Sequence, residues 1–303
     1  MKSFMALFLA LAICFCSFLY SFPAFCTETA IVLSDEAQLK VADAFMEEGE
    51  YYRAITEYKR LLILFPSSAG ADYALFKIGM ACYRGEEYES AAHSLALLRE
   101  RPMAGGYAAQ GRYFEGLSYW KLKKYEYAKV ALRSVAVLCP HSGYAPRALI
   151  ARALVSFDQD DIAGSVNDLQ KLMGSYPAHP GAMRAAEAVK LLGRYHNLPE
   201  KSRVLAGLMS AVIPGSGYMY AGHFKDGVTA FFINGLSVAG AMTGVSQDNY
   251  AVGAIVGGVG LPFYAGNIHG SANAAKKWNA AAKDEFRGKL YSILGFEATK
   301  EDE

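Results

Sequence analysis

The chain repeats itself with a period of 37 residues between positions 40 and 180. Small residues form two columns at this step, which hold Ala54, Ala91, Ala128 and Ser165, and Ala42, Gly79, Gly116 and Ala153. Large residues form two more, which hold Tyr51, Tyr88, Tyr125 and Ile162, and Tyr58, Leu95, Leu132 and Leu169. The prolines of the repeat are Pro66, Pro140 and Pro177, with Pro102 one residue early. A fixed period of this length indicates supersecondary units that stack on one another.

Each column has a physical reading as part of a helical hairpin. Small residues let two helices approach closely, and the tyrosine column follows a break such as Glu48-Gly49-Glu50. The large residue four positions after the second small one lies on the same helical face. Proline then ends the second helix, because it lacks a donor and disfavours helix in the preceding residue. We therefore expect residues 38–198 to form an all-α solenoid of about four hairpins, with 184–197 as a capping helix.

This order of small, aromatic, small, large and proline positions resembles the tetratricopeptide repeat, with 37 residues in place of the usual 34. It is similar in particular to the repeats of bacterial envelope proteins of the BamD type, which end in a Phe-Pro pair as Phe65-Pro66 does here. The resemblance implies a concave groove that binds a peptide or a partner protein. Exposed aromatic side chains are the natural anchors in such a groove, although any one tyrosine also has packing between helices as an alternative. The partner-binding candidates are Tyr52, Tyr83 and Tyr119.

Residues 1–26 read as a secretory signal peptide. Lys2 precedes a 19-residue apolar run, and a small-residue region containing Ala24 and Cys26 follows it. That order of basic start, apolar core and small residues is typical of a signal, with cleavage near Thr27. The apolar run is long, so an uncleaved N-terminal anchor remains an alternative. A cleaved signal would place the repeats outside the cytoplasm.

Residues 199–275 have the composition of a membrane domain. Between Val204 and Ala275 the charged residues are Lys225, Asp226 and Asp248. The apolar runs 227–245 and 250–270 are each long enough to span a bilayer, and a third candidate, 204–222, is interrupted by Pro214. A buried hairpin of a soluble protein is the alternative, which the dense glycine would destabilise by about 1 kcal/mol per residue relative to alanine. The sequence leaves two and three spans open, and residues 276–303 form a polar tail of mixed charge whose side of the membrane depends on that number.

The stretch AVIPGSGYMYAGHFKDG, residues 211–227, opens this domain. A phosphate-binding loop requires a lysine after its glycines, and the hydrolase elbow requires Gly-x-Ser-x-Gly; the spacing here fits neither. The stretch resembles instead the Pro-Gly-x-Gly-x-x-Tyr-x-Gly signature of small two-helix membrane domains, a resemblance that implies no particular activity. The residues that carry it are Pro214, Gly215, Gly217, Tyr220, Gly222 and Gly227, with an echo at Tyr264, Gly266 and Asn267.

Chemistry-bearing residues are sparse. The six histidines have no metal-ligand spacing, no carboxylate pair stands out, and the net charge of +1 argues against a nucleic-acid partner. We therefore expect no enzyme activity, no cofactor and no metal site. The sequence predicts a membrane-tethered interaction scaffold of the bacterial cell envelope, with its repeats in the periplasm and its partners a protein or peptide and membrane lipid. Apolar helices favour the inner membrane over the outer one. The alternative is an accessory subunit of a transport or export system whose glycine-rich spans are functional.

Overall fold

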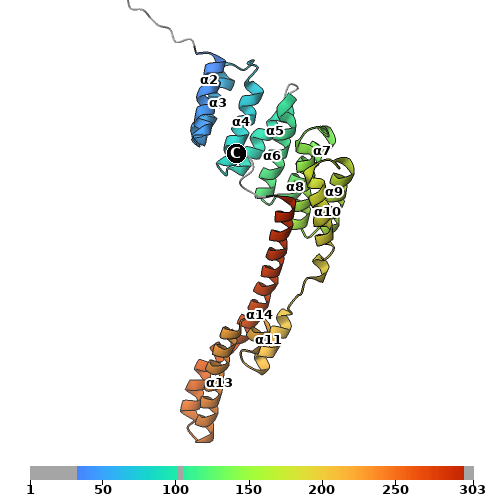
Figure 1. Ribbon diagram of the computed structural model, residues 1–303. Coiled ribbons are helices and arrows are strands. Elements are labelled where there is room, and N and C mark those ends of the chain that lie inside the picture. Colours follow the sequence, from blue (N-terminus) through green and yellow to red (C-terminus); the bar gives the residue numbers. More distant parts are fainter. Residues whose placement is uncertain (1–32, 101–104, 297–303) are drawn as a thin grey trace, which may run out of the picture.

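The computed structural model describes residues 33–100 and 105–296 of the 303-residue chain (Figure 1). The expected signal peptide or anchor 1–26, Pro102 and the end of the tail, 297–303, lie outside the described residues. Within the described ranges every regular element is helical, which confirms the all-α prediction.

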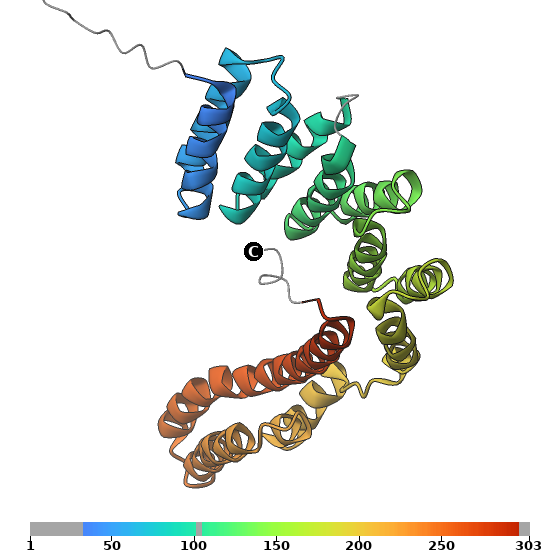
Figure 2. The same cartoon turned by 45° about the horizontal axis from the view of Figure 1, so that its top comes forward.

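Four consecutive helical hairpins and one further helix form a curved solenoid (Figure 2). The hairpins are α2 (Asp35–Glu47) with α3 (Tyr51–Leu64), α4 (Ala71–Arg84) with α5 (Tyr88–Leu97), α6 (Ala108–Lys121) with α7 (Tyr125–Leu138), and α8 (Tyr144–Asp158) with α9 (Ile162–Ser175). Short 3-10 turns are η1 (Leu98–Glu100), η2 (Gly105–Tyr107) and η3 (Tyr195–Asn197). The helix α10 (Pro180–Leu192) closes the stack, beginning and ending a few residues earlier than the expected 184–197.

The sequence columns coincide with fixed places in these hairpins. The tyrosine column supplies the first residue of α3, α5 and α7, and Ile162 does so for α9. The turn before each of these helices contains one residue of positive φ, again at a step of 37: Gly49, Glu86, Lys123 and Asp160. Pro66, Pro140 and Pro177 each follow the C-cap of a second helix.

Small and large columns pack against each other. Ala54, Ala91, Ala128 and Ser165 are fully buried. A Cβ on Gly79 would lie 2.4 Å from a Leu95 methyl group, and one on Gly116 would lie 2.6 Å from Cγ of Leu132. These two glycines therefore set how closely the two helices of their hairpins approach.

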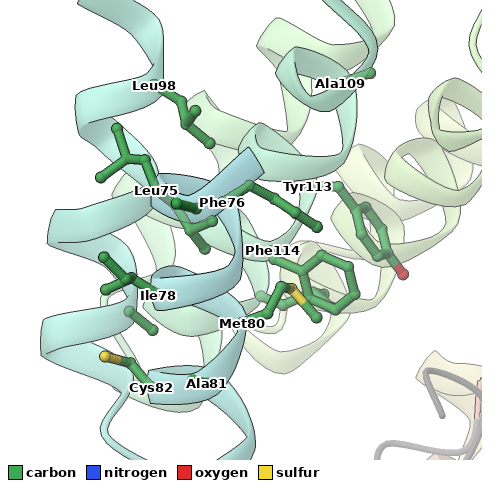
Figure 3. Packing of buried hydrophobic residues seen from close by; sticks show 14 of the residues in the cluster. Leu75, Phe76, Ile78, Met80, Ala81, Cys82, Leu98, Ala109, Tyr113 and Phe114 are labelled. Carbon is green, nitrogen blue, oxygen red and sulfur yellow. The ribbon is translucent and has the colours of Figure 1, made fainter. Parts of the chain in front are cut away.

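Two apolar clusters fill the solenoid. The first joins the first three hairpins and α8 through side chains such as Phe76, Met80 and Phe114 and contains the buried free thiol of Cys82 (Figure 3). The second joins α8, α9 and α10 to the end of the last helix of the chain, through Phe286, Leu290 and Leu294.

The C-terminal half consists of α11 (Arg203–Val212), α12 (Ser216–Tyr220), α13 (Phe224–Ser246) and α14 (Tyr250–Leu294). By length and composition, α13 and α14 are the two helices in the described residues that are long and apolar enough to cross a membrane. The third candidate, 204–222, is instead two short helices separated by a turn at Pro214.

The helix α14 has 45 residues and runs without interruption across the expected boundary between 275 and 276. It pairs with α13 at its start and returns to the solenoid at its end, where it contacts α10 (Figures 1 and 2). Residues 276–294 are therefore part of a folded helix and differ from the separate polar tail that their charges suggested.

Candidate functional site: a groove shared by the repeats and the last helix

A cluster of hydrogen bonds around Asp158 joins α14 to the repeats. The carboxylate of Asp158, with its side chain only 5 % exposed, accepts from Arg287 through Nε at 3.0 Å and Nη2 at 2.7 Å. It also accepts from the Trp120 indole at 2.8 Å and from the Tyr291 hydroxyl at 3.1 Å. Burial, followed by the Asp158 charge, raises the pKa of Tyr291, so the phenol stays protonated and remains a donor.

Apolar packing beside this cluster holds the same helix. Phe286 stacks on Phe157 with ring centroids 5.9 Å apart and meets Tyr195 edge-on at 5.2 Å. Phe286, Leu290 and Leu294, which recur every four residues, are all buried against the last repeats. Because residues four apart share one face of a helix, α14 presents a continuous apolar stripe to the solenoid.

Between the repeats and the end of α14 lies a cavity of about 740 Å³, which we call the shared groove. Its lining is rich in aromatic rings and cations. The aromatic residues are Tyr83, Tyr113, Trp120, Tyr125, Tyr291 and Phe296, and the basic ones are Lys121, Lys123, Arg147, His179, Arg184 and Arg287. This volume falls within the range of pockets that bind small ligands.

The three predicted partner-binding tyrosines lie in different settings. Tyr83 lines the shared groove and packs edge-on against Phe114. Tyr52 is 75 % exposed and donates to Glu87 of the next repeat. Tyr119 is partly buried beside the ring of Tyr127, 5.4 Å away. The structure thus brings only Tyr83 of the three to this groove.

The sequence reasoning missed the contribution of α14 to the groove. A usable signal was present, because Phe286, Leu290 and Leu294 follow helical spacing within an otherwise charged segment. Such a stripe on a polar helix indicates a face that packs against another element.

The glycine motif forms a tight turn that is bonded to α14. Gly215 has φ +85°, and its N–H donates to Oδ1 of Asn267 at 2.9 Å. The Asn267 amide in turn donates to the carbonyl of Ser210 at 3.0 Å. One turn earlier in α14 the Tyr264 hydroxyl donates to the carbonyl of Ala211. The carbonyls of Ser210 and Ala211 in the last turn of α11, and the N–H of Gly215 in the turn that follows, are thereby bonded by side chains of α14.

Three glycines of the motif stand where no side chain fits. A Cβ on Gly215 would lie 1.9 Å from the carbonyl oxygen of Gly227, and one on Gly217 would lie 1.9 Å from that of Ala206. A Cβ on Gly227 would lie 2.6 Å from Cγ of Met219. These distances assign the motif a packing role.

The remaining motif residues are peripheral to this contact. The hydroxyl of Tyr220 accepts from the N–H of Ser202 at 3.1 Å, and Gly222 has φ +91° beside Trp278. A Cβ on Gly266 would meet nothing within 4 Å. Among the residues the structure describes, no group of three His, Cys, Asp or Glu side chains is arranged to hold a metal ion.

A tetratricopeptide repeat family model matches residues 36–68, which comprise the first hairpin, α2 and α3. The chain is similar in fold to a tetratricopeptide repeat protein from Parabacteroides merdae, at 15% identity and a TM-score of 0.44, over 86% of this chain and 98% of that one. It is also similar to the apo form of RapI, at 14% identity and a TM-score of 0.44, over 82% of this chain. The chain spans 65% of the length of RapI. Among curated proteins, none matches the chain.

Proposed function

We propose that this protein is a non-enzymatic, membrane-tethered scaffold of the bacterial cell envelope that binds a partner protein through its repeats. Tetratricopeptide repeats are in general interaction modules, and the matched first hairpin is one of four stacked units. The observation that carries the proposal is the shared groove, because aromatic rings and arginine are the side chains enriched where protein interfaces hold their partners.

The surface of the C-terminal hairpin supports the membrane tether. Ile255 is 67 % exposed and Leu261 69 % exposed, and Phe232 and Leu236 of α13 are exposed as well. A hairpin buried inside a soluble protein would turn such side chains inward, whereas a lipid-facing hairpin turns them outward. An exposed apolar surface of this extent marks a membrane or protein contact.

The return of α14 to the solenoid supports two crossings. If α13 and α14 both cross, the chain enters and leaves the membrane on the same side, and the end of α14 can reach α10 as observed. Three crossings would separate the end of α14 from the repeats by a bilayer. With two crossings and a working signal peptide, the end of α14 and the repeats would both lie in the periplasm.

Protease accessibility in intact spheroplasts tests this topology. One epitope tag is inserted in the turn between α3 and α4, and a second is appended after residue 303. We expect external protease to remove both tags while a cytoplasmic marker survives. Protection of either tag contradicts the proposed arrangement.

Photo-crosslinking from the full-length chain tests partner binding. A crosslinking amino acid replaces Arg184, an exposed residue of α10 that lines the shared groove. The matched control replaces Lys190, which is exposed on the same helix but is not part of the lining. We expect a specific protein adduct from position 184 and none from 190. Adducts of equal yield from both positions would show that the groove is not the binding surface.

A further inference from the structure

The shared groove carries a marked excess of positive charge. The basic residues Lys121, Lys123, Arg147, Arg184 and Arg287 are part of its described lining. Asp158 is the single carboxylate among these lining residues, and it already accepts two hydrogen bonds from Arg287. In a concave site walled by protein, such an imbalance concentrates field lines and favours an anionic occupant.

A titratable residue in the groove responds to this field. Burial, followed by the charges of Arg184 and Arg147, lowers the pKa of His179. Neighbouring cations disfavour an additional positive charge on the imidazole. The lowered pKa of His179 therefore agrees with the excess of basic residues in the groove wall.

The described part of the chain ends at this groove, and an acidic segment follows it in the sequence. Gly295 ends α14 in a left-handed conformation, φ +65°, and the position of its missing Cβ is 1.9 Å from Nη1 of Arg184. Phe296 then lines the groove, with its ring centroid 5.1 Å from that of Trp120. Residues 297–303 follow with the sequence Glu-Ala-Thr-Lys-Glu-Asp-Glu, which has four carboxylates and one lysine.

We infer that residues 297–303 are a ligand of the shared groove in the same chain, and that a partner must displace this acidic segment to bind. The inference deepens the proposed function and rests on it, since it names the occupant of the same groove. Seven residues reach at most about 25 Å at roughly 3.3–3.6 Å per residue, and they start from Phe296, which itself lines the groove with Arg184 and Arg287. A tether this short also gives the segment an effective concentration on the order of millimolar. The displacing partner is accordingly an acidic segment of higher affinity.

A fluorescence titration of the purified full-length chain in detergent tests the inference. The background substitution Trp278→Phe leaves Trp120, in the groove, as the single tryptophan. The tail is neutralised by Glu297→Gln, Glu301→Gln, Asp302→Asn and Glu303→Gln, and a synthetic peptide with the sequence of residues 296–303 is added. We expect the neutral-tail chain to bind this peptide at least tenfold more tightly than the chain with its native tail, with affinity that falls as salt is raised.

Two controls make the result specific. A peptide with the same four neutral substitutions should produce no change in Trp120 fluorescence. In the neutral-tail chain Arg184→Glu should weaken binding of the acidic peptide at least tenfold, whereas Lys190→Glu on the same helix should leave it unchanged.

Three outcomes would overturn the inference. They are equal affinity of the acidic peptide for the native-tail and neutral-tail chains, absence of binding to the neutral-tail chain, and equal binding of the acidic and neutral peptides. No envelope partner is present in this assay. If the titration fails but a position-specific crosslink forms at 184, the tail is not the occupant and the scaffold function stands. If the titration succeeds but no crosslink forms at 184, the tail is the occupant and the partner protein is not supported.

Discussion

The glycines of the motif between Pro214 and Gly227 differ in what surrounds them, although the sequence gives them the same letter. Gly215, Gly217 and Gly227 face backbone or side-chain atoms closer than a Cβ allows, whereas Gly266 in the echo of the motif faces open space. A match to a glycine signature therefore does not show which of its positions are constrained. Only the packing of α11 and α12 against α13 and α14 makes that distinction.

Gly217→Ala should destabilise the C-terminal domain by about 1–3 kcal/mol, the usual cost of overpacking. The added methyl group would meet the backbone carbonyl of Ala206, which a side-chain rotation cannot relieve. Gly266→Ala is the matched control and should be neutral or slightly stabilising, since alanine favours helix. Thermal unfolding in detergent compares the two, and equal melting temperatures would contradict the packing role.

Glu86→Gly should stabilise the solenoid by about 0.5–1 kcal/mol. Glu86 holds a left-handed conformation, φ +61°, which costs an L-residue roughly 1–2 kcal/mol. Glycine removes this cost but loses more conformational entropy on folding, so only part of the gain in stability remains. Gly49 occupies the equivalent place one repeat earlier, at φ +78° with nothing within 4 Å of its Cβ position. Gly49→Ala should therefore lower the denaturation midpoint without a steric clash. Shifts of the same sign in the two variants would refute this account of the turn.

At the scale of elements, the repeat hairpins could be predicted and the docking of α14 could not. Ala54 and its equivalents are buried by a neighbouring helix a few tens of residues away, so their 37-residue step shows directly in the sequence. The bond between Arg287 and Asp158 joins residues 129 positions apart, and no local pattern specifies such a pair. The groove was for this reason predicted as a property of the repeats alone, without its wall from α14.

The N-cap of α10 should make stability dependent on pH. His179 accepts from the N–H of Gly181 through Nδ1 at 3.0 Å, which requires a neutral ring, and its pKa is lowered on folding. The unfolded chain therefore binds more protons than the folded one as pH falls below about 6.5, and stability declines in that window. His179→Asn keeps a cap acceptor without a titrating group. Urea midpoints measured from pH 7.5 to 5 should show a smaller decline for this variant than for the wild type, and parallel declines would exclude the cap.

Asp158→Asn should loosen the end of α14. The substitution removes the charge that Arg287 pairs with and leaves an amide that cannot accept from all three donors. Hydrogen–deuterium exchange should become faster in residues 283–294 and stay unchanged in 250–270. Glu285→Gln breaks only an exposed pair with Lys289 on the same helix and should change neither segment, since solvent-exposed ion pairs contribute little to stability. Unchanged exchange in Asp158→Asn would show that apolar packing alone holds the helix.

At the scale of the whole molecule, α14 connects the solenoid to the apolar hairpin that it forms with α13. Leu290→Asp places a charge in the buried contact between α14 and the last repeats and should separate the two parts while each remains helical. We expect a larger radius of gyration by small-angle scattering, with unchanged helical circular dichroism. Ser292→Asp on the exposed face of the same turn is the control. An unchanged radius for Leu290→Asp would contradict a rigid connection through this contact.

The uninterrupted length of α14 connects its apolar half mechanically to the groove. From Pro262 in its apolar half to Leu294 in the groove, the helix extends about 48 Å at 1.5 Å per residue. Helices change tilt to match bilayer thickness, and a tilt of about 10° at the lower end displaces the upper end by roughly 8 Å. With the hairpin tethered in a membrane as proposed, a thinner or stretched bilayer would pull on the wall of the groove, and the affinity for its occupant would change with the physical state of the lipid.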